Sequence, residues 1–189
     1  MSGTLNFLFS SYNGEKSFAT LVKEAAQQGY AEPDPRLDLA GTDVLRKFLI
    51  SSREGGFPIE REDIDFQGFI PDEIMCNSNT NFPEYAEEFY TKLEEYEPAL
   101  KEQYSAAAAK GEKLRFIAAL DATERTAAGK PKCTISLRSI GKEHPFYTLE
   151  GTDNAVIIES DYYPNAIVIK GAGAGAKQTA GGVLNDILK

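Results

Sequence analysis

Four carboxylates precede one lysine between residues 32 and 47, and these residue types at this spacing could act on a polar substrate. The carboxylates are Glu32, Asp34, Asp38 and Asp43, and the lysine is Lys47. Asp43 and Lys47 are four residues apart, so they share one face of a helix. A lysine beside carboxylates keeps its proton and can donate it to, or polarise, a carbonyl oxygen. The other carboxylates could hold the ammonium group of an amino-acid substrate.

Two other interpretations of this segment stay open at the level of sequence. The first is an exposed acidic turn followed by an ordinary ion pair, which would contribute only about 0.3–0.5 kcal/mol. The second is a metal site formed by Glu32, Asp34 and Asp38, because hard cations prefer carboxylate oxygens. Since the segment contains no recognised cation-binding motif, we predict that the chain holds no metal.

A run of alternating glycine and alanine from residue 171 to residue 176 lies between a predicted strand and a predicted helix. Small residues let a ligand approach the backbone, and free N–H groups at a helix start favour anions. A dinucleotide-binding fingerprint would instead follow the first strand of a βαβ unit, with an acid about 20 residues later. A simple connector is therefore an equally open alternative. His144, the single histidine, lies in no catalytic motif and is expected to be structural.

Helices are predicted in the first part of the chain from apolar residues at helical spacing. They cover residues 17–28, with Ser17 as N-cap, residues 43–53, with Thr42 as N-cap, and residues 83–110, interrupted at Pro98. A last helix is expected over residues 179–188. Residues 32–41 are predicted to form a loop because they contain two prolines and Gly41. Residues 5–9 fit either a strand or a helix, since the apolar run is too short to decide.

Strands follow the helices. The period of the sequence changes to two over residues 114–119 and 133–138, which predicts an antiparallel hairpin, and residues 155–160 and 166–170 predict a second strand pair. Helices followed by paired strands indicate an α+β fold, with a mixed, largely antiparallel sheet and helices packed on one face.

The composition limits the class of protein. The chain has 189 residues, of which 42% are hydrophobic and 26% charged, as is typical of a soluble globular domain. Its net charge of -9 argues against nucleic-acid and membrane partners, and no apolar run approaches the roughly 20 residues needed to cross a bilayer. Cys76 and Cys133 are far apart, which favours a reducing, cytoplasmic location. Because apolar residues follow Met1 almost at once, we expect an excised domain.

Four separated blocks of the sequence resemble the catalytic and dimerisation domain of homoserine dehydrogenases, in the order in which that family has them. The blocks are Ser2-Gly-Thr-Leu-Asn6; Gly29-Tyr-Ala-Glu-Pro-Asp-Pro-Arg36 with Asp43-Val-Leu-Arg-Lys47; Gly151-Thr-Asp-Asn154; and the run from Gly171 to Ala176 with Thr179-Ala-Gly-Gly-Val183. The Asp-Pro-Arg form is most similar to enzymes fused to aspartate kinase, although some stand-alone fungal enzymes share it.

The resemblance implies NAD(P)-dependent reduction of L-aspartate 4-semialdehyde to L-homoserine, a step toward threonine and methionine. By position, Lys47 would donate a proton to the carbonyl oxygen, and Asp43 would orient the substrate and Lys47. The residues implied to bind the substrate or line its pocket are Glu32, Asp38, Tyr30 and Thr4. Gly175 matches a cofactor-contacting position, and Gly173 and Ala174 are expected close to it.

The resemblance also implies what lies outside this sequence. The family's N-terminal Rossmann domain carries the glycine fingerprint, a second substrate-facing lysine and a sodium-binding loop, and none of these is present. We therefore expect residues 1–189 to be one domain, the substrate-binding half, and to be inactive alone. The choice between NAD and NADP stays open, because the missing half recognises the ribose. A non-catalytic dimerisation module is the alternative, and a homodimer is expected in either case because the family pairs protomers through its sheet.

Overall fold

The computed structural model describes residues 2–75, 81–173 and 176–188. The helices are α1 (Gly3–Ser11), α2 (Phe18–Gln27), α3 (Arg36–Leu39), α4 (Thr42–Glu54), α5 (Asp72–Met75), α6 (Phe82–Glu95), α7 (Glu97–Ala108) and α8 (Ala176–Ile187). The strands are β1 (Ile64–Phe66), β2 (Lys113–Arg125), β3 (Pro131–Ile140), β4 (Asp153–Ile158) and β5 (Ile167–Ala172). This order confirms the predicted α+β class. Among the described residues, no helix is both long and apolar enough to cross a membrane.

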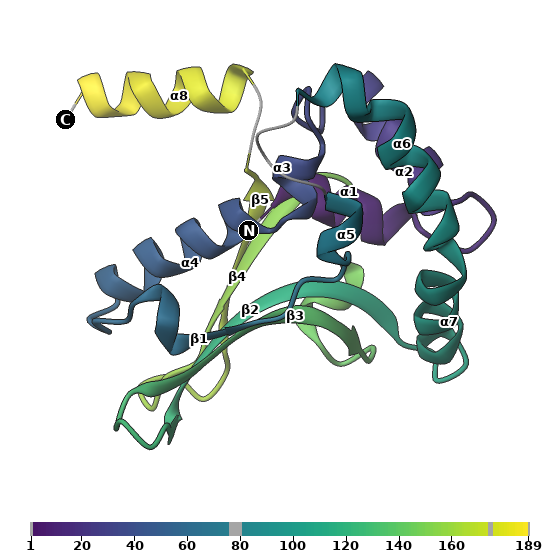
Figure 1. Cartoon of the computed structure of the whole chain (residues 1–189). Coiled ribbons are helices and arrows are strands. Elements are labelled where there is room, and N and C mark those ends of the chain that lie inside the picture. The colour runs from purple at the N-terminus through teal and green to yellow at the C-terminus, as the bar shows by residue number, and fades with distance from the viewer. Residues whose placement is uncertain (1, 76–80, 174–175, 189) are drawn as a thin grey trace.

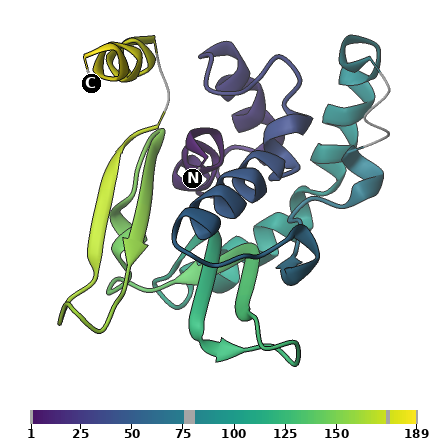
Figure 2. The same cartoon turned by 90° about the vertical axis from the view of Figure 1, so that its left-hand side faces the viewer.

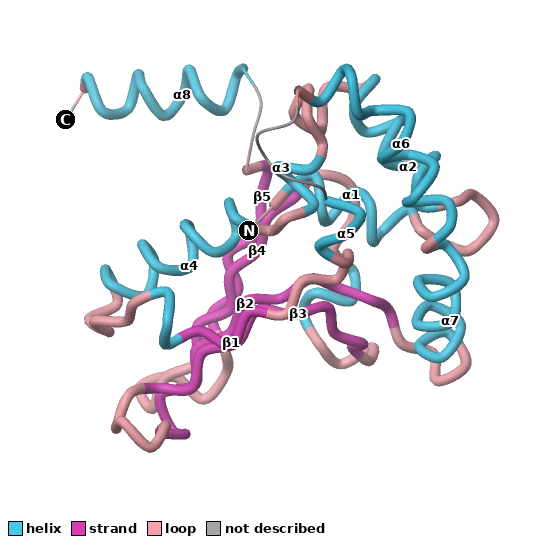
Figure 3. The backbone as a smooth tube through the Cα atoms, viewed as in Figure 1, coloured by secondary structure: helices cyan, strands magenta, loops and turns pink. Residues whose placement is uncertain are grey.

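The strands form a three-stranded sheet in the order β1-β3-β2 and a separate two-stranded sheet, β4-β5. Strands β2 and β3 are antiparallel, whereas the short β1 runs parallel to β3, so the larger sheet is mixed. Both predicted strand pairs are confirmed. Helices α1 to α6 lie on one side of the three-stranded sheet (Figures 1 and 3). The β4–β5 hairpin stands beside that sheet (Figure 2).

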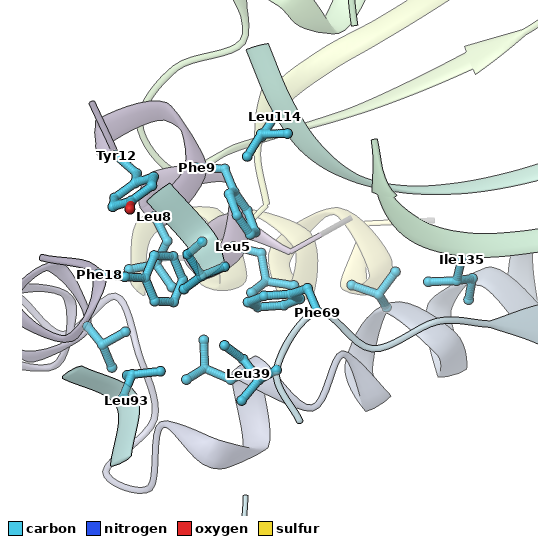
Figure 4. Close-up of a cluster of buried hydrophobic side chains, with 14 of the residues drawn as sticks. Leu5, Leu8, Phe9, Tyr12, Phe18, Leu39, Phe69, Leu93, Leu114 and Ile135 are labelled. Atoms are coloured by element: carbon cyan, nitrogen blue, oxygen red, sulfur yellow. The ribbon is translucent and has the colours of Figure 1, made fainter. Parts of the chain in front are cut away.

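Helix α1 lies at the centre of the core and settles the ambiguous segment in favour of a helix. Its buried side chains recur at helical spacing, and the Ser2 hydroxyl accepts the Leu5 N–H at 3.2 Å as an N-cap. Phe9 meets the Phe69 ring edge-on, with 5.0 Å between ring centroids. Figure 4 shows these side chains with residues from other helices and from the sheet, among them Phe18, Leu39, Leu93, Leu114 and Ile135.

Two local predictions around the acidic segment are wrong. Residues 32–41 are not all loop, because Arg36–Leu39 form one helical turn, and the Asp34 carboxylate accepts the backbone N–H of Arg36 at its start. Thr42 is not the cap of α4 but its first residue, and Gly41 holds the N-cap position with φ +66°. A Cβ on Gly41 would lie 3.0 Å from the Phe116 ring, so this crowded joint favours glycine.

The remaining helix predictions agree with the structure except at their ends. Ser17 caps α2 by accepting the Thr20 N–H, and Pro98 lies in the first turn of α7, just after the break between α6 and α7. The last helix begins at Ala176 rather than at Thr179.

Candidate active site

The predicted ion pair lies on the solvent side of α4. Lys47 Nζ is 2.7 Å from Asp43 Oδ2, and the Lys47 side chain is 45% exposed. The opposite face of the helix buries Val44, Leu45 and Phe48 against the core, and this burial fixes the direction in which the pair points. An exposed pair of this kind adds little stability. Its accessibility instead leaves the lysine amine within reach of a ligand.

The loop acids are joined to the start of α1 by Asp38. The Thr4 hydroxyl lies 2.9 Å from Asp38 Oδ1 and 2.6 Å from the Tyr30 carbonyl oxygen, and it shares its single proton between these two acceptors. The backbone N–H of Glu32 donates to Asp38 Oδ2 at 2.8 Å. The Tyr30 ring packs against Phe7, with 5.1 Å between ring centroids. Four of the predicted site residues therefore form one connected group.

The charge of Asp43 links this group to α4. Burial raises the pKa of Asp38; hydrogen bonds from the Glu32 N–H and from Thr4 oppose that rise, and the charges of Glu32 and Asp43 add to it. Asp43 is therefore close enough to Asp38 for their charges to interact. Helix α3, which carries Asp38, contacts both α1 and α4 (Figure 1). The structure thus brings the predicted substrate residues and the Asp43–Lys47 pair into one region.

Replacing Thr4 with valine is expected to raise the pKa of Asp38 further. The substitution removes a hydrogen bond that stabilises the charged carboxylate, while the burial that raises this pKa stays. Because the folded-state pKa lies above the unfolded one, folding stability falls as the pH rises from the unfolded toward the folded pKa. An NMR titration of the Asp38 carboxyl carbon should give a higher midpoint in Thr4→Val than in the wild type.

A matched substitution controls this titration. Thr123 also donates to an aspartate, Asp121, but at an exposed position on β2. Thr123→Val should leave the Asp38 midpoint unchanged. A midpoint in Thr4→Val equal to or below that of the wild type would show that Thr4 does not stabilise the charged form of Asp38.

Asp34 differs from the other acids of this segment because it is paired with an arginine. Its two carboxylate oxygens accept hydrogen bonds from the Arg36 guanidinium, with Nη2–Oδ2 at 2.8 Å and Nε–Oδ1 at 2.9 Å. Asp34 is thus occupied by a cation of the chain itself. In the described part of the chain, no group of three or more His, Cys, Asp or Glu residues could hold a metal ion. This arrangement speaks against the metal site that Glu32, Asp34 and Asp38 were considered to form.

Of the three residues predicted to contact the cofactor, Gly173 belongs to the residues that the structure describes. Ala174 and Gly175 lie outside the described residues, whereas Gly173 follows β5 directly. A Cβ on Gly173 would overlap the side-chain amide of Asn154, so the backbone approaches that amide closely. Asn154 Oδ1 is buried and has no hydrogen-bond partner among the residues that the structure describes. This oxygen could accept a hydrogen bond from a hydroxyl or amide of a ligand, which is compatible with a nucleotide cofactor beside Gly173.

His144 has a structural position. Its Nδ1 accepts the backbone N–H of Phe146 at 3.1 Å, which caps the short 3₁₀ helix Pro145–Thr148. Burial lowers the pKa of His144, which favours the neutral ring that this cap requires. His144 also lines a cleft of about 580 Å³ between α4, β2 and β4. None of the acids predicted to hold substrate lines that cleft, and neither does Lys47.

Two residues of this region were given no role from sequence. They are Arg36, which holds Asp34, and Asn154, which packs on Gly173. Both belong to the sequence blocks that carry the family resemblance, which was the available signal. Their contacts could not be predicted because each depends on how the backbone is folded around them.

Comparison with known proteins agrees with the resemblance. Residues 1–188 match the family model for homoserine dehydrogenase. The whole chain is 40% identical to bifunctional aspartokinase/homoserine dehydrogenase 1, chloroplastic, of Arabidopsis thaliana, of which it covers 19%. It is 38% identical to homoserine dehydrogenase of Saccharomyces cerevisiae, of which it covers 50%. The crystal structure of a Candida auris protein of unknown function superposes on the whole chain with a TM-score of 0.83 and 34% identity, and 51% of that protein is covered.

The chain spans half or about half of the yeast and Candida proteins and a fifth of the plant protein. The family match, in contrast, extends over nearly every residue of the chain itself. This chain therefore belongs to the homoserine dehydrogenase family.

Proposed function

We propose that this chain is the substrate-binding half of an NAD(P)-dependent homoserine dehydrogenase, which reduces L-aspartate 4-semialdehyde to L-homoserine. One observation carries the proposal. Asp38 on α3 is bonded to Thr4 and to the Glu32 N–H, which holds the acidic loop (residues 32–38) in place, and α3 contacts α4, the helix that carries the Asp43–Lys47 pair. Acids that can hold an ammonium group and an amine that can donate a proton therefore lie in one region.

In the proposed reaction, Glu32 and Asp38 bind the substrate ammonium directly or through water, and Thr4 and Tyr30 line the pocket. Lys47 donates a proton to the oxygen of the C4 carbonyl as that carbonyl is reduced. Asp43 orients the amine through the 2.7 Å ion pair. A positioned acid of this kind typically contributes a factor of about 10² to 10⁴ in rate.

NADH or NADPH, when bound, would supply the hydride. Gly173 and the Asn154 amide oxygen would contact the cofactor, together with Ala174 and Gly175 as the resemblance implies. We propose that most of the cofactor site lies in an N-terminal Rossmann domain of the natural polypeptide. This proposal is supported by the share of the relatives that the chain covers, which is at most about half.

We also propose that the chain forms a homodimer through the β4–β5 sheet. Val156 pairs with Ile169 and Ile158 pairs with Ile167, so these four side chains lie on one face of the sheet. Their exposed fractions run from 38% to 59%. Soluble monomers seldom expose such contiguous apolar surface, which favours a protein partner on this face. A dimerisation role is compatible with catalysis and is also the alternative to it.

Replacing Ile169 with lysine is expected to convert the dimer to a monomer, because each protomer would bury an unpaired charge in the interface. Light scattering after gel filtration measures the change in mass. Ile50 on α4 is similarly exposed, and Ile50→Lys is the control that should leave the mass unchanged. A wild-type chain that is monomeric at every concentration would contradict the proposed dimer.

The cellular location, and the expectation that the chain binds neither nucleic acid nor membranes, stay predictions. The charge of -9 argues against nucleic acid and anionic membranes. The cytoplasmic location is predicted from the two widely separated cysteines, whereas the Arabidopsis relative is named as chloroplastic.

The proposed activity is tested on the natural polypeptide that carries this sequence. That polypeptide should oxidise NADH or NADPH when L-aspartate 4-semialdehyde is added, and comparison of the two cofactors shows which one it prefers. The 189-residue chain alone should show no such turnover. A natural polypeptide that is dimeric yet inert with the semialdehyde and both cofactors would favour the non-catalytic dimerisation module.

A further inference from the structure

Arg36 is a buried arginine whose guanidinium pairs with the carboxylate of Asp34 in the same loop. Only 5% of its surface is exposed. Its Nη2 and Nε donate to the two oxygens of Asp34, and its backbone N–H donates to Asp34 Oδ1 at 3.0 Å. Moving an arginine out of water costs free energy unless an ion pair of this kind compensates it. The two parallel hydrogen bonds between the guanidinium and the carboxylate form a bidentate fork, which holds both groups in one orientation. The pair therefore rigidifies the turn from residue 34 to residue 36.

The guanidinium also contacts two aromatic rings of α6. Its central carbon lies 5.2 Å from the centre of the Phe82 ring and 5.5 Å from that of Tyr85. Tyr85 is itself fixed, because it is buried and its hydroxyl donates to the Ile74 carbonyl oxygen. A cation over aromatic rings is attracted to them, most strongly where water is excluded. Arg36 thus fastens the acidic loop to a helix that lies far away in the sequence.

The contacts of Arg36 lie inside the turn that carries the substrate acids. The Glu32 N–H donates to Asp38 Oδ2, which closes the segment from residue 32 to residue 38. Arg36 and Asp34 lie between these two closing residues. The backbone that connects Glu32 to Asp38 therefore runs through this pair, and we expect loss of the pair to loosen their relative positions. Asp43 and Lys47, in contrast, belong to α4 and are paired with each other.

We propose that Arg36 is a positioning residue for substrate binding. Acting through Asp34 and the α6 rings, it sets the orientation of Glu32 and Asp38 toward the ammonium group of the substrate. This inference rests on the proposed function, because it assumes that these two acids hold the substrate. In this proposal Arg36 acts through these contacts rather than by touching the substrate, because only 5% of its surface is exposed.

The test compares three variants of the natural polypeptide with one control. Arg36→Met removes the fork and the charge but keeps most of the stem, Arg36→Lys keeps the charge without the fork, and Asp34→Asn weakens the pair from the other side. The control is Arg53→Met at the far end of α4, where Arg53 pairs with the exposed Glu60. The readouts are KM and kcat for the semialdehyde and the hydrogen-exchange rate of the Glu32 amide.

Arg36→Met should raise KM about tenfold or more while kcat changes by less than about threefold, because substrate binding is loosened and the proton donor is not. The Glu32 amide should exchange faster. Arg36→Lys should recover part of the KM loss, and Arg53→Met should resemble the wild type. If Arg36→Met does not fold, Asp34→Asn should show the same pattern of KM and exchange, with smaller changes.

Two results would overturn the inference. One is a folded Arg36→Met variant that has the wild-type KM and the wild-type exchange rate at Glu32. If Arg36→Met is unfolded, the same result for a folded Asp34→Asn variant counts in its place. The other is a fall in kcat as large as the rise in KM, which a merely structural role predicts. Failure of the proposed function is distinguishable, because the wild-type polypeptide would then be inactive with the semialdehyde. In that case, faster exchange at Glu32 would support the positioning of the loop, and unchanged exchange would refute it.

Discussion

Lys47→Met should lower kcat for reduction of L-aspartate 4-semialdehyde about a thousandfold and change KM by less than about threefold. The lysine amine is proposed to act on the carbonyl oxygen only as negative charge develops there, so its loss affects the transition state more than the bound substrate. Methionine keeps the aliphatic part of the side chain and removes the proton donor. Steady-state kinetics of the natural polypeptide measure both constants.

The adjacent residue provides the control for this experiment. Arg46 is also an exposed cation of α4, and Arg46→Met should leave kcat within about threefold of the wild type. Added methylamine should restore part of the turnover of Lys47→Ala, because it supplies an ammonium group in the space left by the side chain. Equal losses in kcat and in apparent affinity for Lys47→Met, or no loss at all, would contradict its role as proton donor.

Asp38→Asn should raise KM for the semialdehyde about ten- to a hundredfold, with a much smaller effect on kcat. A hydrogen bond to a charged group is worth about 1.5–3 kcal/mol, which corresponds to this range of affinity. The substitution keeps the shape of the side chain but removes its charge. Because a carboxamide has only one acceptor oxygen, it cannot accept from both Thr4 and the Glu32 N–H as the carboxylate does.

Asp65 on β1 is the matched control, since its carboxylate is exposed and belongs to a strand outside the predicted site. Asp65→Asn should have wild-type kinetics. If Asp38→Asn binds the semialdehyde as tightly as the wild type, the substrate ammonium is held by other groups, and the assignment of the loop acids is wrong.

The parts of the fold that sequence predicted are those set by local periodicity. Helix α2 was predicted from its apolar spacing and from Ser17, and the β2–β3 hairpin from a period of two along each strand. The five residues 5–9 could not be assigned, since so short a stretch of largely apolar residues fits a strand or a helix equally well. The turn at Arg36 was missed because it is stabilised by the Asp34 side chain, which overrides the breaking effect of two nearby prolines.

The site was predicted in its residue types but not in its connections. The Asp43–Lys47 pair follows from helical spacing alone, and the structure contains it. The bond from Thr4 to Asp38 spans 34 residues, and Arg36 meets rings on α6 that are still farther along the chain. Such contacts depend on how helices pack, which no local pattern encodes. The crowding that requires Gly41 likewise comes from Phe116, on a distant strand.

The catalytic arrangement is tested most directly by a crystal structure of the natural polypeptide with L-homoserine bound. The ammonium group of homoserine should lie within hydrogen-bonding distance of Glu32 or Asp38, directly or through one water, and its hydroxyl oxygen should accept a hydrogen bond from Lys47 Nζ. Homoserine bound away from these acids, with the Lys47 amine directed into solvent, would contradict the account.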